Sequence, residues 1–304
     1  MIQRYEHQGV VWVDVEQPTP DDIDTLQQEF KLGPLLAQEL LSPTLKPRVD
    51  LYPEFAYTVL HFPALRHTHG ARSTQEVDII LGKQFIITVH YDTITALVDF
   101  ARSFEAATLM KRAPGKFHSG HVLFELTQRL YQGVEHELDA IEDSVSAIER
   151  AIFSGKERQM VIAISATSRE LLNHKRTLGT HGEVLGSLEH AGATLFGEGF
   201  SDYLRGVSSF HYRVHNRALG LTDTIMELRD TNNSILSTRQ NETIKNLTIM
   251  TFITAPLAVI VGLFGMNTSA TPIIGRPDDF WVVIGIMTLV GAVLFLYFRI
   301  KRWL

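Results

Sequence analysis

Histidine and glutamate side chains at helical spacing are the first residues in this chain that could do chemistry. His211 and His215 lie four residues apart, which puts both imidazoles on one helix face and can hold a zinc ion. The stretch 136–140 (HELDA) begins like a zinc-protease motif but has Ala140 where the second histidine is required. The chain has 13 histidines, so chance pairs are expected, and we interpret His211 and His215 as surface or interhelical residues.

Other catalytic groups are missing from the sequence. There is no cysteine, which excludes disulfides, zinc-thiolate sites and cysteine nucleophiles. Neither a GxSxG elbow nor a GxGxxG or GxxxxGK[ST] phosphate loop occurs. The formal charge is −6, and residues 1–246 hold 24 basic against 32 acidic groups, whereas a general nucleic-acid-binding protein needs a basic surplus. We therefore expect no enzyme, no bound cofactor and no nucleic-acid partner.

Two long apolar runs near the C-terminus show where the chain meets lipid. Leu247–Met266 has 20 residues and Phe280–Phe298 has 19, and neither contains a charged side chain. About 20 apolar residues are needed to cross the hydrocarbon core of a bilayer. Trp281, Tyr297 and Trp303 are placed like interfacial aromatic anchors. The alternative, a pair of buried helices in a soluble core, is weakened by the polar loop between the runs and the basic tail after them.

The basic residues beside these runs predict the topology. Arg299, Lys301 and Arg302 follow the second run, and Arg239 and Lys245 precede the first, so the positive-inside rule puts both termini in the cytoplasm. The first 15 residues lack the pattern of a signal peptide. We expect an inner-membrane protein with a cytoplasmic α/β domain (1–115), long antiparallel helices (116–199), a stalk helix (200–246), a first transmembrane helix (247–266), an extracytoplasmic loop (267–279), a second transmembrane helix (280–298) and a basic tail (299–304).

The N-terminal part alternates strand and helix signals. Thr19 before an acidic turn predicts the N-cap of a helix that ends at Phe30, and Gly82-Lys83 predicts a tight turn. β-branched and aromatic runs predict strands. These runs are Val10–Val15, Phe55–Phe62, Val77–Leu81 and Phe85–His90, and we expect a mostly antiparallel sheet.

From Gly120 the pattern changes to long helices. Apolar residues at alternating spacings of four and three form one heptad seam from Val134 to Ile152 and a second from Val214 to Ile235. The six glycines of Gly179–Gly199 predict a break between helices. After it, a helix over Phe200–Met266 would measure about 100 Å. We interpret the acidic side chains beside the first seam as a solvated face.

The end of the first apolar run carries a family resemblance. Gly265-Met266-Asn267 closes this charge-free run and a second such run follows, which resembles the CorA family of divalent-cation (magnesium) channels. The approach to this motif and the PRV, VLHFP and LGK stretches near residues 47, 59 and 81 are also similar to the family, so the resemblance covers nearly the whole chain. It implies a funnel-shaped homopentamer in the membrane, with the first transmembrane helices around the pore. The loop and the basic ending resemble the ZntB-type zinc branch of the same superfamily.

The resemblance also implies the site. Gly265, Met266 and Asn267 would select the ion, and the Asn267 amide would accept hydrogen bonds from the waters of a hydrated cation, which suits Mg²⁺ because it gives up water reluctantly. Mg²⁺ is the first candidate, and Co²⁺, Ni²⁺ or Zn²⁺ are further ones. No pore residue is charged, which favours voltage-driven passage over a proton relay. The pore face, at helical spacing, would be Asn241, Ile244, Leu247 or Thr248, Thr251, Ala255, Ala258 and Gly262.

Two departures from the family pattern affect this expectation. The loop acids that would gather cations come late, at Asp278 and Asp279. Gly206 stands where magnesium-gated relatives often carry an aspartate, and its side chain has no atom that could bind a metal ion. A regulatory Mg²⁺ from the cytoplasm would therefore lack this ligand. A proton-coupled zinc transporter and a non-conducting coiled-coil tether remain the alternative functions.

Overall fold

The computed structural model of the chain describes residues 2–64, 74–109, 117–197, 200–266, 273, 275, 277–301 and 303. The chain divides into two compact units, residues 1–229 and residues 230–304, which are described in turn. One helix, α7 (Ser201–Phe264), contributes to both.

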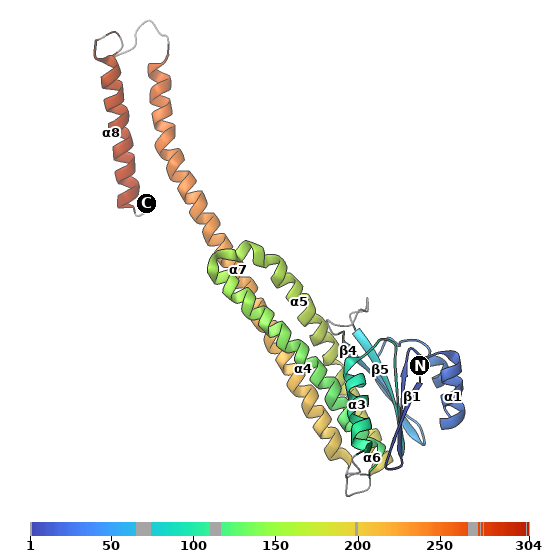
Figure 1. Ribbon diagram of the computed structural model, residues 1–304. Coiled ribbons are helices and arrows are strands. Elements are labelled where there is room, and N and C mark those ends of the chain that lie inside the picture. Colours follow the sequence, from blue (N-terminus) through green and yellow to red (C-terminus); the bar gives the residue numbers. More distant parts are fainter. Residues whose placement is uncertain are drawn as a thin grey trace. The chain divides into compact units, whose positions relative to one another are not determined.

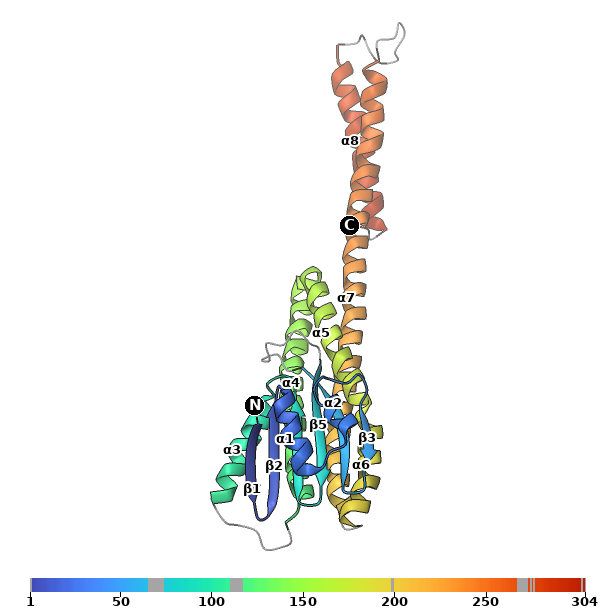
Figure 2. The same cartoon turned by 90° about the vertical axis from the view of Figure 1, so that its right-hand side faces the viewer.

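The first unit contains a six-stranded sheet with the strand order β1-β2-β6-β5-β4-β3 (Figures 1 and 2). Only the β2–β6 pair is parallel among the described strands, which confirms the expected mostly antiparallel sheet. The strands are β1 (Ile2–His7), β2 (Val10–Glu16), β3 (Arg48–Leu51), β4 (Phe55–Pro63), β5 (Thr74–Gly82) and β6 (Phe85–His90).

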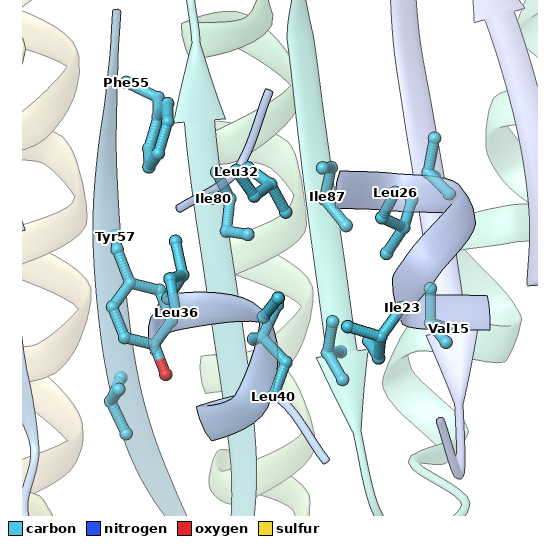
Figure 3. Close-up of a cluster of buried hydrophobic side chains, with 14 residues drawn as sticks. Val15, Ile23, Leu26, Leu32, Leu36, Leu40, Phe55, Tyr57, Ile80 and Ile87 are labelled. Carbon is cyan, nitrogen blue, oxygen red and sulfur yellow. The ribbon is translucent and has the colours of Figure 1, made fainter. Parts of the chain in front are cut away.

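Two short helices, α1 (Pro20–Phe30) and α2 (Pro34–Glu39), cover one face of this sheet. The predicted N-cap is confirmed, because the Thr19 hydroxyl accepts from the N–H of Asp22 at 3.2 Å while the Asp22 carboxylate accepts from the N–H of Thr19 at 3.1 Å. Figure 3 shows Ile23 and Leu26 of α1 packed on alternate residues of the strands, which form one dry core.

Helices α3 (Thr95–Leu109), α4 (Ser119–Ala151), α5 (Glu157–Gly179) and α6 (His181–Phe196) lie on the other face (Figure 1). A π-helical turn, Ile152–Lys156, joins α4 to α5, and Gly155 adopts a φ of 90° there, a conformation that favours glycine. The expected break over Gly179–Gly199 is wrong for most of its length. Helix α6 forms there because Val184, Leu188 and Leu195 recur at helical spacing and are buried.

The start of α6 is held by a buried histidine. The Tyr131 hydroxyl of α4 donates to Nδ1 of His181 at 2.8 Å, and Nε2 of His181 donates to the carbonyl of His61 on β4 at 2.6 Å. The ring is fully buried, and this burial lowers the pKa of His181 to about 3. A neutral imidazole therefore ties two helices to the sheet.

The first predicted heptad seam is buried throughout, and the second is buried except for its last residue, Ile235, which is half-buried and belongs to the second unit. Every residue of the α4 seam from Val134 to Ile152 is buried, as are Val214, Ala218 and Ile225 of α7. Arg217 of α7 contacts Asp139 of α4 at 2.6 Å and Glu142 at 2.5 Å. The predicted solvated face is confirmed for Asp139, Glu142 and Asp143, which are exposed, whereas Glu137 is buried.

The second unit consists of the C-terminal part of α7 and helix α8 (Asp279–Ile300). The rings of Phe252 on α7 and Phe298 on α8 meet edge to face, 6.3 Å apart. Both helices are long and apolar enough to cross a membrane, and only 6 % of the most apolar window of α7 and 0 % of that of α8 are buried. Core helices of a soluble protein would be mostly buried, so the structure favours two transmembrane helices.

Candidate functional site

The exposed face of α7 is the candidate ion pathway. Ile249 is buried, and Ile253, Pro256 and Ile260 follow it at helical spacing as half-buried residues. Each residue of this stripe lies two positions from a predicted pore residue, and two positions turn a helix by about 200°. The predicted residues therefore lie on the opposite face of α7. In the single chain they are all exposed: Asn241, Ile244, Leu247, Thr251, Ala255, Ala258 and Gly262.

Residue size separates this face from its neighbours on α7. At membrane depth it carries Thr251, Ala255, Ala258 and Gly262, and the exposed Thr254 lies beside it, whereas Phe252, Val259, Val261 and Leu263 on either side are bulky and each more than half exposed. Small residues allow close approach of helices or leave room for water. Bulky apolar residues are suited to lipid or to neighbouring helices.

Leu247 and Thr248 were alternatives for one position of the face. Leu247 is 64 % exposed, while Thr248 is half-buried and lines a pocket that α7 shares with α8. The exposed face therefore continues through Leu247. Together with Ile244, Leu247 forms an apolar segment on the N-terminal side of the small residues. Rings of such side chains can close a pore by excluding water.

The Thr251 hydroxyl is a polar group of the face at membrane depth. It donates to the carbonyl of Leu247 at 2.9 Å, which satisfies its only hydrogen. The lone pairs of its oxygen stay available as acceptors. Water bound to a cation presents hydrogens outward, so the hydroxyl oxygen can attract a hydrated cation without replacing its water.

Gly265 and Met266 follow the end of α7 directly. The N–H of Gly265 donates to the carbonyl of Val261 at 2.9 Å, and a Cβ on Gly265 would lie 3.0 Å from the same oxygen. A larger residue at this position would require the carbonyl to shift by a few tenths of an ångström. Met266 is 54 % exposed. Asn267, the residue with the chemistry most suited to hydrated cations, lies outside the described residues.

The two loop acids have different surroundings. Both carboxylate oxygens of Asp279 accept from backbone donors at the start of α8, from Phe280 N–H at 2.6 Å and from Gly275 N–H at 3.2 Å. Asp278 is exposed, precedes the first turn and makes no side-chain capping bond. Of the two, Asp278 has the carboxylate that is open to cations in solution, and Asp279 stabilises the start of a helix.

Gly206 lies on α7 in the first unit against an aromatic ring of α4. A Cβ added to Gly206 would come within 2.8 Å of Cε2 of Phe124. A carboxylate side chain at this position would therefore require Phe124 to move. The close packing gives a physical reason why the residue is glycine in this chain.

The two histidines of α7 do not form a metal site in the structure. Nε2 of His211 donates to the carbonyl of Leu178 at 2.8 Å, and the rings of His211 and His215 stack with centroids 5.5 Å apart. Burial lowers the pKa of both residues, which keeps them neutral. Within the described parts of the chain, no three or more histidine and carboxylate side chains are grouped so as to hold a metal ion.

Comparisons with known proteins agree with the fold and the two apolar helices. The structure of CorA magnesium transporter from Methanocaldococcus jannaschii superposes with a TM-score of 0.85 at 20 % identity, covering 99 % of this chain and 93 % of that one. The cobalt/magnesium transport protein CorA of Thermotoga maritima is 25 % identical over 285 residues, covering 93 % of this chain and 80 % of the relative. The ZntB cytoplasmic domain of Vibrio parahaemolyticus has a TM-score of 0.63 at 13 % identity, covering 77 % and 91 %.

The family comparison covers both units. The family described as "CorA-like Mg2+ transporter protein" matches residues 7–302, which includes strands β2 to β6, the long helices and both apolar helices. Among the described elements, only β1 (Ile2–His7) lies outside the matched residues, apart from His7. This chain therefore belongs to the CorA-like Mg²⁺ transporter family.

Proposed function

We propose that this protein is a homopentameric channel for passive, voltage-driven transport of hydrated divalent cations, most favourably Mg²⁺, across the inner membrane. Both termini would lie in the cytoplasm, as the basic residues beside the two apolar runs predict. The names of the relatives, which include cobalt/magnesium transport proteins, support a divalent cation as the cargo.

One observation carries the proposal: α7 has an uncharged face of small residues opposite its half-buried stripe, and this face leads to Gly265-Met266-Asn267. Two helices cannot enclose a water-filled path by themselves, so a conducting form needs several copies around an axis. The face is exposed in the single chain and is available to line such an axis. The second apolar helix, α8, would then lie outside, against lipid.

The absence of charge on this face supports a voltage-driven mechanism over a proton-coupled one. Proton relays use ionisable groups inside the membrane, and the apolar part of α7 holds none. A divalent ion that follows the membrane potential gains about 4.6 kcal/mol per 100 mV, twice the value for one elementary charge. Rings formed by the Thr251 hydroxyl and the Asn267 amide would attract the hydrated ion weakly enough to release it.

The domain boundaries follow from the same proposal. Residues 1–115 and 116–199 would form the cytoplasmic domain, residues 200–246 the stalk, residues 247–266 and 280–298 the two transmembrane helices, residues 267–279 the extracytoplasmic loop and residues 299–304 a cytoplasmic tail. Asp278 would then face the extracytoplasmic side, where a carboxylate raises the local cation concentration.

The test is ion flux into proteoliposomes that contain the full-length protein, at a membrane potential fixed by a potassium gradient and valinomycin. Mg²⁺ entry should rise with inside-negative voltage, persist without a pH gradient and be reduced by competing Co²⁺. Zn²⁺ flux that follows a pH gradient at zero voltage would instead establish a proton-coupled zinc transporter. A well-folded oligomer without any divalent flux would establish a non-conducting tether.

A further inference from the structure

An open pocket lies in the second unit between α7, α8 and the C-terminal residues. Its volume is about 440 Å³, within the range of about 300–1,000 Å³ that small-ligand sites occupy. The hydroxyl of Thr248 at its edge is engaged, because it donates to the carbonyl of Ile244 at 2.8 Å. The other walls are Phe252, Leu294, Tyr297, Phe298, Lys301 and Trp303.

The chain after α8 builds one wall of this pocket. The N–H of Trp303 donates to the carbonyl of Phe298 at 2.9 Å, and the N–H of Lys301 donates to that of Tyr297 at 3.0 Å. The bond from Lys301 spans four residues, as in a helix, whereas the bond from Trp303 spans five and closes the end of α8, and the indole of Trp303 lies 6.0 Å from the ring of Phe298. Phe298 in turn contacts Phe252, and the pocket is therefore largely formed before any ligand enters.

The chemistry of the walls is divided between an apolar body and a polar rim. Phe252, Leu294 and Phe298 offer only hydrocarbon. Lys301 and Trp303 offer an ammonium and an indole N–H, and the structure gives neither side chain a hydrogen-bonding or ionic partner among the described residues. A ligand that fits has an apolar chain and an anionic head.

The position of the pocket along the chain identifies the source of that ligand. It lies where the charge-free run ends and the basic residues Arg299, Lys301 and Arg302 begin. In a membrane this is the level of the lipid headgroups, which tryptophan and tyrosine prefer. With the topology proposed above, on which this step rests, the level is that of the cytoplasmic leaflet, whose anionic lipids attract basic residues.

We propose that this pocket binds an anionic phospholipid of the cytoplasmic leaflet, with an acyl chain along Phe252, Leu294 and Phe298 and the phosphate at Lys301 and Trp303. The bound lipid would fill the gap between the two transmembrane helices at their cytoplasmic ends. It would therefore stabilise the contact between α7 and α8.

The chain carries its own reporter for a test. Of its three tryptophans, Trp12 is fully buried in the sheet and Trp281 stands at the opposite end of α8, so Trp281→Phe leaves Trp303 as the tryptophan near the pocket. This variant is reconstituted at full length into nanodiscs that contain brominated phosphatidylglycerol or brominated phosphatidylcholine. Brominated lipid in contact with Trp303 quenches its fluorescence.

Brominated phosphatidylglycerol should quench at an about fivefold lower mole fraction than brominated phosphatidylcholine, the preference that one lysine at an anionic surface provides. Lys301→Gln should abolish most of this preference. Arg299→Gln removes the same charge outside the pocket and should change the preference less than twofold. Size-exclusion profiles check that both variants are assembled.

Equal quenching by the two lipids, or an equal loss of preference in the two variants, would overturn the proposal. So would a cross-link from Phe252→benzoylphenylalanine to a second copy of the chain instead of to lipid. Lipid contact is measured here without ion flux, so either result can be obtained whether or not the channel proposal holds.

Discussion

Gly265 lies directly against the carbonyl oxygen of Val261, to which its own N–H donates at 2.9 Å and to which an added Cβ would come within 3.0 Å. This contact fixes the chain at the point where α7 ends and the proposed selectivity residues begin. A change at Gly265 therefore alters the position of the next two residues without removing any polar group.

Gly265→Ala should lower Mg²⁺ flux about tenfold, since tight overpacking typically costs about 1–3 kcal/mol and a tenfold change in rate corresponds to about 1.4 kcal/mol. Initial rates of flux in proteoliposomes measure the effect. Gly285→Ala on α8 is the control, because no atom of the described residues outside the backbone of α8 itself lies within 4 Å of a Cβ at that position. Equal flux in both variants would contradict a positioning role for Gly265.

Thr251→Val should lower divalent-cation flux several-fold. The change keeps the shape of the side chain and removes the oxygen that can accept hydrogen bonds from hydration water, each worth about 0.5–1.5 kcal/mol. Thr288→Val on α8 is the matched control, because that hydroxyl also donates to the carbonyl four residues earlier, at 2.8 Å. If the two variants reduce flux equally, Thr251 does not line the path.

Asp78→Asn should stabilise the cytoplasmic domain at neutral pH. Asp78 is fully buried on β5, and burial, followed by the neighbouring charge of Glu76, raises its pKa well above the usual value. A raised folded-state pKa gives stability that is present below the unfolded pKa and is lost as pH rises through the folded pKa.

Asparagine does not ionise, so the variant does not lose stability in this way as pH rises. Its apparent Tm at pH 7.5 should therefore be roughly 2–4 °C above that of wild type, and the dependence of Tm on pH above 4 should flatten. Differential scanning fluorimetry across pH 4–8 measures both effects. Asp24→Asn, at an exposed position of α1, serves as the control. A lower Tm for Asp78→Asn at every pH would contradict a costly buried carboxyl.

His181 should make the fold sensitive to acid. Its pKa is lowered by burial to about 3, below the unfolded value of about 6.5, so the unfolded state binds an extra proton between these values. Stability is therefore lost as pH falls from 6.5. His181→Gln should be less stable at pH 8, because it loses the bonds to Tyr131 and His61, but its Tm should fall less steeply between pH 6.5 and 4.5.

The same fluorimetric titration tests this, with the exposed His136→Gln as control. An equally steep fall of Tm in wild type and His181→Gln would show that another group causes the acid sensitivity. An unchanged Tm at pH 8 would show that the buried hydrogen bonds contribute nothing to stability.

Local sequence signals predicted much of the fold, and long-range contacts explain the rest. The Thr19 cap and the β6 strand depend on neighbouring residues, and both are confirmed. Helix α6 was missed because its glycines argue for a break, while apolar residues that stabilise it, such as Leu195, form a core cluster with the distant Ala56 of β4. The bond from His181 to the carbonyl of His61 joins residues 120 apart, and no local pattern predicts it.

The candidate site also has features that local sequence predicts and features that depend on the folded chain. Helical spacing alone places Thr251, Ala255 and Ala258 on one face, and their exposure in the single chain agrees with that prediction. The pocket at Lys301 was not predicted, because it depends on how the chain folds back after α8. Basic and aromatic residues at the end of an apolar run were the available signal, and they were interpreted only as evidence of topology.

The most direct test of the central claim compares wild type with Asn267→Ala in voltage-clamped Mg²⁺ flux, using full-length protein in proteoliposomes of the same lipid. If a hydrated divalent ion moves along an uncharged path through a ring of Asn267 amides, the alanine variant should assemble normally and lose most of the voltage-driven flux. Equal flux in the two proteins at every voltage would contradict it.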